Sequence, residues 1–205
     1  MGNAATQTRE RYARGEGDRL RVDLLDAAAE LMAEHGSIEG ISLRAVARRA
    51  GVSPTAVYRH FDDHVDLLQD SVTHCWTNFR SALASSIDPD LDPFVNFERM
   101  GRAYIAFALD HPGQYRVMFS NRIAPGGDLE SVGSSAFQML VDHVKTMLDT
   151  RSDTRDPFFV AVQVHTWIHG IVDLISSHPG LAWPSVDELL DGLEHALALA
   201  PPSAT

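Results

Sequence analysis

Apolar residues recur along this chain with the three- and four-residue spacing of amphipathic helices. Glycine- and proline-containing breaks separate the periodic stretches. No stretch alternates with the two-residue period of a half-buried strand, and no hairpin dipeptide lies between β-rich runs. The pattern predicts an all-α fold of about nine helices. The helices are expected at residues 20–35, 43–50, 54–60, 63–85, 94–110, 112–119, 129–150, 157–177 and 185–199.

A tight turn is predicted between the second and third of these helices. Ser42 precedes the helix over Leu43–Ala50, where its hydroxyl is placed to act as a cap. Gly51 supplies the turn, because glycine adopts positive φ without steric cost. Ser53 and Pro54 open the next helix, the serine as a hydroxyl cap and the proline at a position where its missing N–H does no harm. Helix, tight turn and short helix in this order are typical of a DNA-binding helix-turn-helix.

The short helix that begins at Pro54 is predicted to contact the bases of DNA. Val57 and Phe61 are its inward residues, which leaves its other side chains facing outward. The N-terminal end of such a helix meets base edges in the major groove. Thr55 is expected to hydrogen-bond a base there, and Ala56 is expected to touch a thymine methyl group.

The distribution of charge supports the same assignment. Residues 41–61 hold four arginines and no acidic residue in a chain of formal net charge −11. Residues 22–40 hold five acidic residues and no lysine or arginine, and the balance from residue 62 to the end is −12. A cationic segment can still bind DNA in such a chain, because phosphate neutralisation is a local event. DNA is therefore expected at residues 41–61, and the acidic remainder is expected to have a different role.

Further side chains of this cationic segment are candidates for contact with DNA. Tyr58 and His60 are expected to contact phosphate. Arg44 and Arg59 either hold phosphate or bind guanine in a bidentate manner, and the sequence leaves both open. The two remaining arginines of the segment are interpreted as phosphate contacts or solvated charges. The predicted DNA-binding residues are Ser42, Arg44, Ser53, Pro54, Thr55, Ala56, Tyr58, Arg59 and His60.

Cysteine usage and hydropathy bear on the compartment. Cys75 is the single cysteine, so no intrachain disulfide is expected and a reducing cytoplasm fits. Its helical neighbours Val72 and Phe79 are apolar, which predicts an inert buried thiol. The apolar run at residues 158–162 is far shorter than a bilayer crossing, and the N-terminus shows no signal-peptide core. A cytoplasmic protein without membrane contact is predicted.

Together these residues resemble the TetR family of transcriptional repressors. The resemblance spans about residues 20–68. The matching residues are 42–47 (SLRAVA), 51–53 (GVS), 56–61 (AVYRHF) and 67–68 (LL). Many members carry lysines after the last phenylalanine, where this chain has Asp62, Asp63 and His64. The N-terminal N–H groups of the fourth helix then remain as the candidate for a phosphate contact.

The C-terminal part resembles the subgroup of that family with a Trp-His-Gly signature. The signature appears here as Trp167, His169 and Gly170. The resemblance implies a homodimer that binds near-palindromic double-stranded operator DNA and is released by a small lipophilic or aromatic effector. No cofactor and no enzymatic activity are expected. The expected parts are a mobile N-terminal arm (1–18), a helix-turn-helix DNA-binding domain (19–66), an effector-binding and dimerisation domain (67–200) and a tail (201–205).

The family's architecture implies an effector pocket among the helices of the second domain. Any one of the candidate lining residues, taken alone, is better explained as core packing. As a group they are interpreted as the lining of a cavity with a few polar groups. The candidates are Trp76, Phe79, Phe97, Tyr104, Phe107, Tyr115, Met118, Phe137, Met147, His165, Trp167 and His169.

Two alternatives remain beside this interpretation. His165, His169 and Asp173 follow one another at four-residue intervals, a spacing that can hold a metal ion, so a metal-dependent enzyme is a weak alternative. A dimer contact or a solvated face explains the same spacing. A DNA-binding regulator or activator without a ligand is the second alternative. Gly170 inside an apolar helix is expected to mark close approach of another helix, because a helical glycine costs about 1 kcal/mol relative to alanine.

Overall fold

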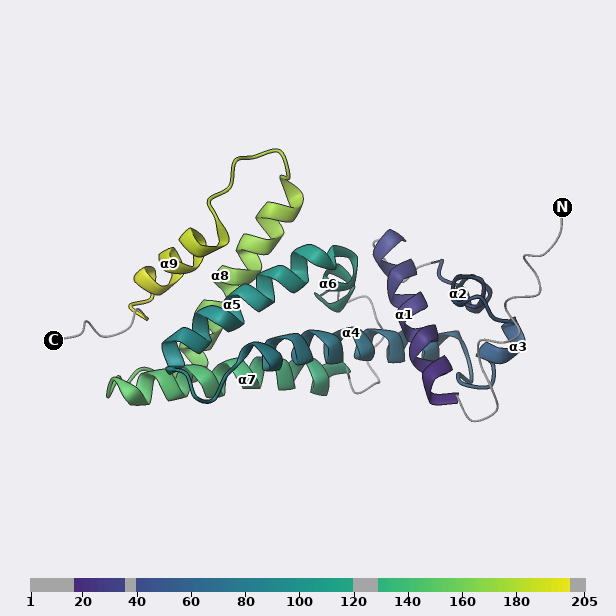
Figure 1. The fold of residues 1–205 in the computed structure, drawn as a ribbon, viewed down its shortest axis with the longest axis horizontal. Coiled ribbons are helices and arrows are strands. Elements are labelled where there is room, and N and C mark those ends of the chain that lie inside the picture. The colour runs from purple at the N-terminus through teal and green to yellow at the C-terminus, as the bar shows by residue number, and fades with distance from the viewer. Residues whose placement is uncertain (1–16, 36–39, 120–128, 200–205) are drawn as a thin grey trace. The chain divides into compact units, whose positions relative to one another are not determined.

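The structure is a computed structural model that describes residues 17–35, 40–119 and 129–199, without the side chains of residues 129–132. Helices and no strands occur in these described residues, which confirms the predicted all-α class. Most of the predicted arm and all of the predicted tail lie outside them. The helices are α1 (Gly17–His35), α2 (Leu43–Ala50), α3 (Pro54–Val57), α4 (His64–Ser86), α5 (Pro93–Asp110), α6 (Pro112–Phe119), α7 (Leu129–Thr150), α8 (Pro157–Ser177) and α9 (Val186–Ala196) (Figure 1).

The chain divides into two compact units. The first holds residues 1–75 together with 113–129, and the second holds residues 76–112 together with 130–205. The division falls within α4 and again at the start of α6. The segment that begins at Gly113 therefore groups with the helix-turn-helix, although it lies far from it in sequence. The expected functional boundary at residue 66 stays a prediction.

In the first unit, α1, α2 and α3 pack in sequence order. α1 contacts α2, and α2 contacts α3 (Figure 1). Leu24 and Met32 of α1, Val46 of α2 and Leu67 of α4 are completely buried. Burying each such side chain contributes about 1.5–3 kcal/mol, so the apolar positions predicted for these helices build one common core.

α3 is shorter than predicted, because regular helix ends at Val57 instead of near residue 60. The following residues form turns, in which the Val57 carbonyl accepts hydrogen bonds from the N–H groups of His60 (2.9 Å) and Phe61 (3.1 Å). Val57 and Phe61 are both buried, as predicted, with exposed fractions of 0 and 1 %. Both side chains thus reach the same core across these turns.

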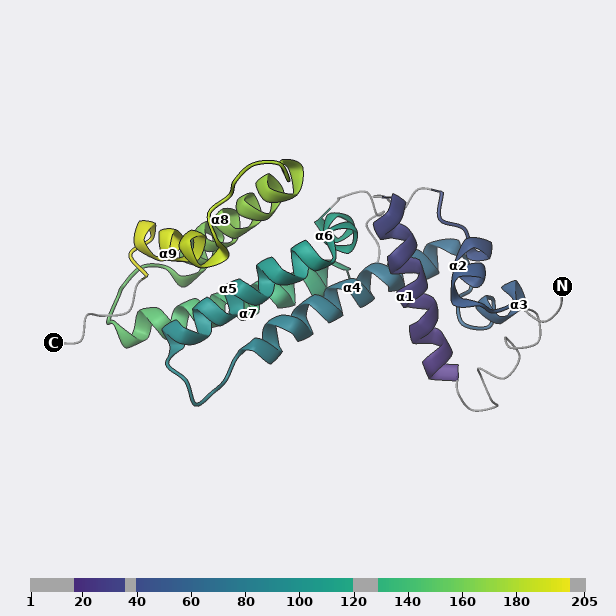
Figure 2. The same cartoon turned by 45° about the horizontal axis from the view of Figure 1, so that its top comes forward.

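In the second unit, α5 contacts α8 and α9, and α8 contacts α9 (Figure 2). Side-chain caps begin several of these helices. Asp156 accepts a hydrogen bond from the N–H of Phe158 at 3.0 Å. Ser185 and Glu188 form the predicted capping box, with 3.2 Å between the Ser185 hydroxyl and the Glu188 N–H. Such caps satisfy N–H groups that the helix itself leaves free.

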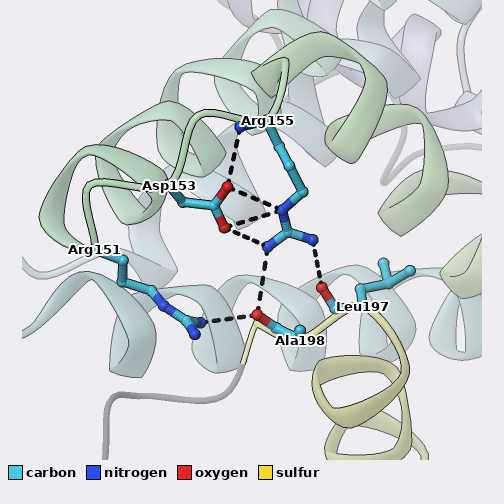
Figure 3. Close-up of polar contacts among 5 residues, drawn as sticks. All are labelled: Arg151, Asp153, Arg155, Leu197 and Ala198. Carbon is cyan, nitrogen blue, oxygen red and sulfur yellow. Dashed lines mark hydrogen bonds and ion pairs between the residues drawn. The ribbon is translucent and has the colours of Figure 1, made fainter.

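An arginine clamp holds the C-terminal end of α9 (Figure 3). Arg155 lies against the Asp153 carboxylate, with its Nη2 2.7 Å from Oδ2, and its Nη1 donates to the Leu197 carbonyl at 2.6 Å. Arg151 donates to the Ala198 carbonyl at 2.8 Å. Two cations thus satisfy carbonyls that a helix C-terminus leaves free, where the helix dipole also favours positive charge.

Among the described helices, α8 alone is long and apolar enough to cross a membrane by length and composition. Its most apolar window has a mean hydropathy of 1.5 and is 28 % buried. The buried residues Val160, Val164, Ile168 and Val172 lie along one face. A core helix of a soluble protein meets the same criteria, so a single helix of this kind is weak evidence for a membrane segment.

Candidate functional site

The turn between α2 and α3 has the local chemistry that the sequence predicts. The Ser42 hydroxyl caps α2 by accepting a hydrogen bond from the N–H of Ala45 at 3.2 Å. Gly51 ends α2 with a φ of +70°, a conformation that disfavours a residue with a side chain. Ser53 holds the cap position of α3, but its side chain makes no capping hydrogen bond. The predicted role of the Ser53 hydroxyl as a cap is therefore wrong, and the hydroxyl stays exposed.

The predicted DNA-binding residues lie on the accessible side of this helix-turn-helix. Tyr58 is 58 % exposed, a large value for an aromatic ring. Ala56 and His60 are half-buried, since they flank the buried Val57. The remaining predicted residues are exposed, namely Ser42, Arg44, Ser53, Pro54, Thr55 and Arg59.

The arginines of the segment divide into two kinds. Arg49 is held by two carboxylates of α1, at 2.6 Å from Glu34 and 3.1 Å from Glu30. The hydrogen bonds to Glu34 and then to Glu30 raise the pKa of Arg49. Within the described part of the chain, Arg44, Arg48 and Arg59 form no ion pair with a carboxylate. Arg49 thus joins α2 to α1, and three exposed cations remain for phosphate.

The start of α4 is occupied by its own acidic residues. The Asp63 carboxylate accepts hydrogen bonds from the N–H groups of Val65 (2.7 Å) and Asp66 (2.9 Å). The Asp66 carboxylate accepts one from the N–H of Asp62 at 3.1 Å. The prediction that these N–H groups meet a phosphate is therefore wrong, because carboxylates already satisfy them. His64 turns inward and contacts the Ile41 carbonyl.

Seven of the predicted effector-site residues come together in the second unit as one cluster of ring contacts. The Phe79 ring lies 5.0 Å from Tyr104, 5.2 Å from Phe107 and 5.9 Å from Trp76, all edge to face. His165 joins these rings to a second group. The members of this ring cluster are Trp76, Phe79, Tyr104, Phe107, Phe137, His165 and His169, from α4, α5, α7 and α8.

His165 occupies the centre of the ring cluster. Its imidazole lies 6.0 Å from Tyr104, 5.7 Å from Phe137 and 5.7 Å from the ring of His169. Burial and then the charge of His169 lower the pKa of His165. A neutral imidazole among aromatic rings can both donate and accept a hydrogen bond, which suits it to orient a mainly apolar ligand.

The structure places the other predicted effector-site residues in different surroundings. Tyr115 and Met118 belong to α6 and thus to the first unit. Phe97 stacks with His143 at 6.5 Å, and Met147 is fully buried in the core. Trp167 is 39 % exposed on α8. These five were selected by residue type alone, which cannot distinguish a ligand-facing position from a core or surface position.

A glycine of α7 helps to place Trp76, and its sequence position alone did not mark it. A Cβ built on Gly133 would lie 3.4 Å from Cζ2 of the Trp76 ring. The indole therefore packs directly over the glycine. The sequence feature that could have identified Gly133 is the free-energy cost of a glycine inside a helix, which is also the feature that marks Gly170.

The histidine face of α8 does not assemble a metal site in the described residues. The His165 and His169 rings stack with 24° between their planes, and Asp173 is exposed. The described part of the chain holds no group of three or more His, Cys, Asp or Glu side chains that could bind a metal ion. The metal-enzyme alternative therefore finds no support here.

Two family models match this chain. Residues 24–70 match the model of bacterial regulatory proteins of the tetR family, and residues 97–197 match that of the tetracyclin repressor-like C-terminal domain. The first match covers the helix-turn-helix and the second covers most of the second unit. The Trp-His-Gly subgroup stays a prediction.

Individual proteins agree with the family models. An uncharacterised HTH-type transcriptional regulator of Haemophilus influenzae is 44 % identical over 50 residues, which is 24 % of each chain. This chain thus spans about a quarter of that curated relative's length. A solved protein of unknown function from Rhodococcus sp. RHA1 is 27 % identical, with 92 % of this chain and 96 % of that one covered at a TM-score of 0.74. A TetR family transcription regulator from Marinobacter aquaeolei VT8 shares the fold, with 18 % identity, a TM-score of 0.70 and coverage of 91 % and 98 %.

Proposed function

This chain belongs to the TetR family of bacterial transcription regulators, and we propose that it is a repressor that binds a near-palindromic operator as a homodimer and leaves it when a small molecule binds. One observation carries the proposal. An exposed recognition helix stands beside three exposed arginines in a chain of net charge −11. DNA is the partner that such a local concentration of positive charge favours. A regulator of bacterial DNA acts in the cytoplasm, and we propose this location.

The outer face of α8 supports a homodimer. Phe159, Val162, Thr166, Gly170 and Leu174 are three or four residues apart and lie opposite the buried face of the helix. Phe159 is 61 % exposed and Leu174 is 47 % exposed. A Cβ built on Gly170 meets no other atom within 4 Å inside the chain. An apolar stripe with an open glycine at its centre fits close approach of a second copy, and a two-fold dimer mirrors a palindromic operator.

The ring cluster supports an effector of mainly apolar, aromatic character. α4 runs without interruption from His64, next to the helix-turn-helix, to residues Trp76 and Phe79 of the ring cluster. We propose that an effector packed near Trp76 and Tyr104 tilts α4 and changes the spacing of the two recognition helices. DNA requires that spacing to be about 34–36 Å, one helical turn. By linkage, operator DNA must weaken effector binding by the factor that the effector weakens DNA binding.

Paired arginine variants test the DNA interface. Arg48→Ala is expected to weaken binding equally on specific and random DNA and to flatten the salt dependence. The slope of log K against log salt should fall by about 1 for each phosphate that the variant no longer neutralises. Arg49→Ala is the matched control, because this neighbour in the same helix is engaged by Glu30 and Glu34. Gel-shift titrations at several salt concentrations give the slopes. Equal salt-dependence slopes for Arg48→Ala and Arg49→Ala would contradict the division of the arginines into those that contact phosphate and the one paired with carboxylates.

Base reading is tested separately at Thr55. Thr55→Ala is expected to relax sequence preference by about 1–3 kcal/mol at one base pair, since one base contact of this kind carries that discrimination. The measurement is the ranking of operator variants by affinity. If every variant keeps its rank, Thr55 does not contact a base. If DNA binding by the unmodified protein depends neither on salt concentration nor on DNA sequence, the DNA-binding proposal itself is contradicted.

The effector site is tested by replacing one aromatic ring of the cluster with a smaller aliphatic side chain. Phe79→Leu is expected to raise several-fold the concentration of effector that releases DNA, while ligand-free DNA affinity stays nearly unchanged. Phe97→Leu is the control, because Phe97 is equally buried, at 3 % exposure against 2 % for Phe79, and lies outside the cluster. A thermal-shift screen of lipophilic compounds supplies the effector. If Phe79→Leu loses DNA binding and keeps full effector affinity, the pocket lies elsewhere.

A regulator or activator that needs no ligand is the remaining alternative. It shares the helix-turn-helix and the dimer face with the repressor, so DNA binding alone does not separate the two. Release of operator DNA by a compound that binds the second unit separates them. A compound that binds without changing operator affinity would favour the alternative.

A further inference from the structure

A buried carboxyl group lies in the last turn of α9. Glu194 is 6 % exposed, between the fully buried Leu193 and the exposed His195. Its Oε1 has no hydrogen-bond partner among the described residues. Burying a carboxylate without a partner costs free energy, and such a group tends to keep its proton instead. Nothing in the DNA-binding or effector roles requires this residue.

The charges around Glu194 make ionisation harder. Glu98 of α5 and Asp191 of α9 both disfavour a further negative charge. Arg102 of α5 favours it, but its guanidinium already pairs with Glu98 at 3.1 Å and with Asp187. Burial first, then Glu98 and Asp191, raise the pKa of Glu194 from an ordinary value of 4.5 to about 7.

Other titratable groups on the neighbouring elements do not change this balance. α8, which also packs against α9, carries His165, His169 and Asp173, and the segment before α8 carries Arg151 and Arg155. None of these contributes to the shift at Glu194. The field at this carboxyl comes from α5 and from α9 itself.

Both ends of α9 are held by polar contacts. The capping box of Ser185 and Glu188 holds the start, and the clamp of Arg151 and Arg155 holds the end (Figure 3). Between them α9 packs closely on α5. Cδ2 of Leu190 lies 2.8 Å from the position that a Cβ on Gly101 would occupy. Leu190 precedes Glu194 by one helical turn, so a charge at Glu194 acts on this close contact.

We propose that the contact of α9 with α5 is a proton-operated switch centred on Glu194, tight when this carboxyl is protonated and loosened when it is ionised. The dimer face of the proposed function includes the adjacent α8, and α9 packs against α8. Resting on that proposed function, we infer that dimerisation and operator binding weaken as pH rises towards and past neutrality.

The sign follows from the two protonation states. The folded-state pKa, about 7, lies above the ordinary 4.5 that applies to the unfolded chain. Between these values the native protein keeps a proton that the unfolded chain has released. Stability from this group is therefore complete below about pH 4.5, falls as pH rises to about 7 and is level above it.

Glu194→Gln tests the switch, because glutamine keeps the shape and cannot ionise. Urea unfolding of both proteins is measured from pH 5 to pH 8.5. The ratio of their unfolding constants is expected to change by roughly 75-fold between the two ends, which is the part above pH 5 of the roughly 300-fold effect that the two pKa values give in full. A ratio that does not change with pH overturns the proposal. The carboxyl carbon-13 shift of Glu194 in the unmodified protein, expected to titrate near pH 7, decides the case if the variant does not fold. A midpoint near 4.5 overturns it.

A second variant separates charge from packing. Asp191→Asn removes one negative neighbour and leaves Glu194 in place, so the Glu194 midpoint is expected to move to lower pH. An unmoved midpoint contradicts the electrostatic origin of the switch. The dimer dissociation constant, measured by sedimentation at pH 6 and pH 8, is expected to rise with pH in the unmodified protein and not in Glu194→Gln. If Glu194 titrates near pH 7 as expected but the dimer dissociation constant does not change with pH, the proposed link between Glu194 ionisation and dimerisation is rejected. If the unmodified protein is monomeric at both pH values, the homodimer of the proposed function is rejected, whereas the titration of Glu194 still tests the contact of α9 with α5.

Discussion

Gly113→Ala is expected to destabilise the first unit by about 3 kcal/mol, at the upper end of the usual range for overpacking. A Cβ at this position would lie 2.0 Å from the Cα and 2.5 Å from the carbonyl oxygen of Ala33. Those are backbone atoms of α1, so no side chain can turn away to make room. Either α1 or α6 must shift, and both belong to the unit that holds the helix-turn-helix. A loss of this size is a large fraction of the roughly 5–15 kcal/mol that stabilises a typical domain.

Urea unfolding followed by circular dichroism measures this loss. Gly180→Ala is the matched control, because a Cβ there meets no atom within 4 Å, and its effect is expected to stay within about 0.5 kcal/mol. Because α6 and α1 are in direct contact, Gly113→Ala is also expected to weaken operator binding at temperatures where the protein remains folded. Equal unfolding midpoints for the two variants would show that α6 does not pack this closely on α1.

Helix positions were predictable from the sequence because they depend on local chemistry. The capping box of Ser185 with Glu188 and the start of α8 after Asp156 involve residues two or three positions apart. Gly51 at positive φ is similarly a property of one residue and its neighbours. α3 ends earlier than predicted, in turns whose hydrogen bonds converge on the Val57 carbonyl. Helical periodicity indicates that a helix is present but does not fix its last residue.

Contacts between distant residues were the part that sequence could not supply. Arg49 pairs with carboxylates 15 and 19 positions earlier, which engages its charge within the chain. The segment after Pro112 groups with residues 1–75, and no local pattern indicates this. Predicting either feature requires the packing of α1 to be known first.

The candidate site shows the same difference between features set by local sequence and features set by tertiary packing. Exposure of the DNA-binding residues followed from the period of a short amphipathic helix, and only Ala56 and His60 are less exposed than expected. The effector-site candidates were chosen by residue type, and only those from α4, α5, α7 and α8 that face one another form the ring cluster. Trp167 shows why residue type is not sufficient. Because α8 is apolar on nearly every side, its sequence pattern does not indicate which side faces away from the core. The raised pKa of Glu194 was also hidden, because its burial depends on α5.

Gly170→Leu is expected to convert the proposed dimer into a monomer at micromolar concentration. The chain itself has room for the new side chain, because no atom lies within 4 Å of a Cβ at this position. Leucine even favours the helix over glycine by up to about 1 kcal/mol. Any destabilisation must therefore arise between copies. In a two-fold interface each substitution occurs twice, so overpacking of about 1–3 kcal/mol per site becomes about 2–6 kcal/mol per dimer. The dissociation constant should rise roughly 30-fold or more, since about 1.4 kcal/mol is tenfold.

Sedimentation velocity across a concentration series measures this change, and thermal unfolding of the monomer supplies the internal check. The variant monomer should be at least as stable as the unmodified monomer, because helix propensity improves and nothing within the chain is crowded. Gly180→Leu, placed beyond the end of α8 and equally open, is expected to remain dimeric. Operator affinity should fall together with dimerisation, whereas weak binding to random DNA should persist, because the arginines proposed to bind phosphate lie in the other unit. An unmodified protein that is monomeric at micromolar concentration, or a Gly170→Leu variant that dimerises normally, would place the interface away from this face of α8.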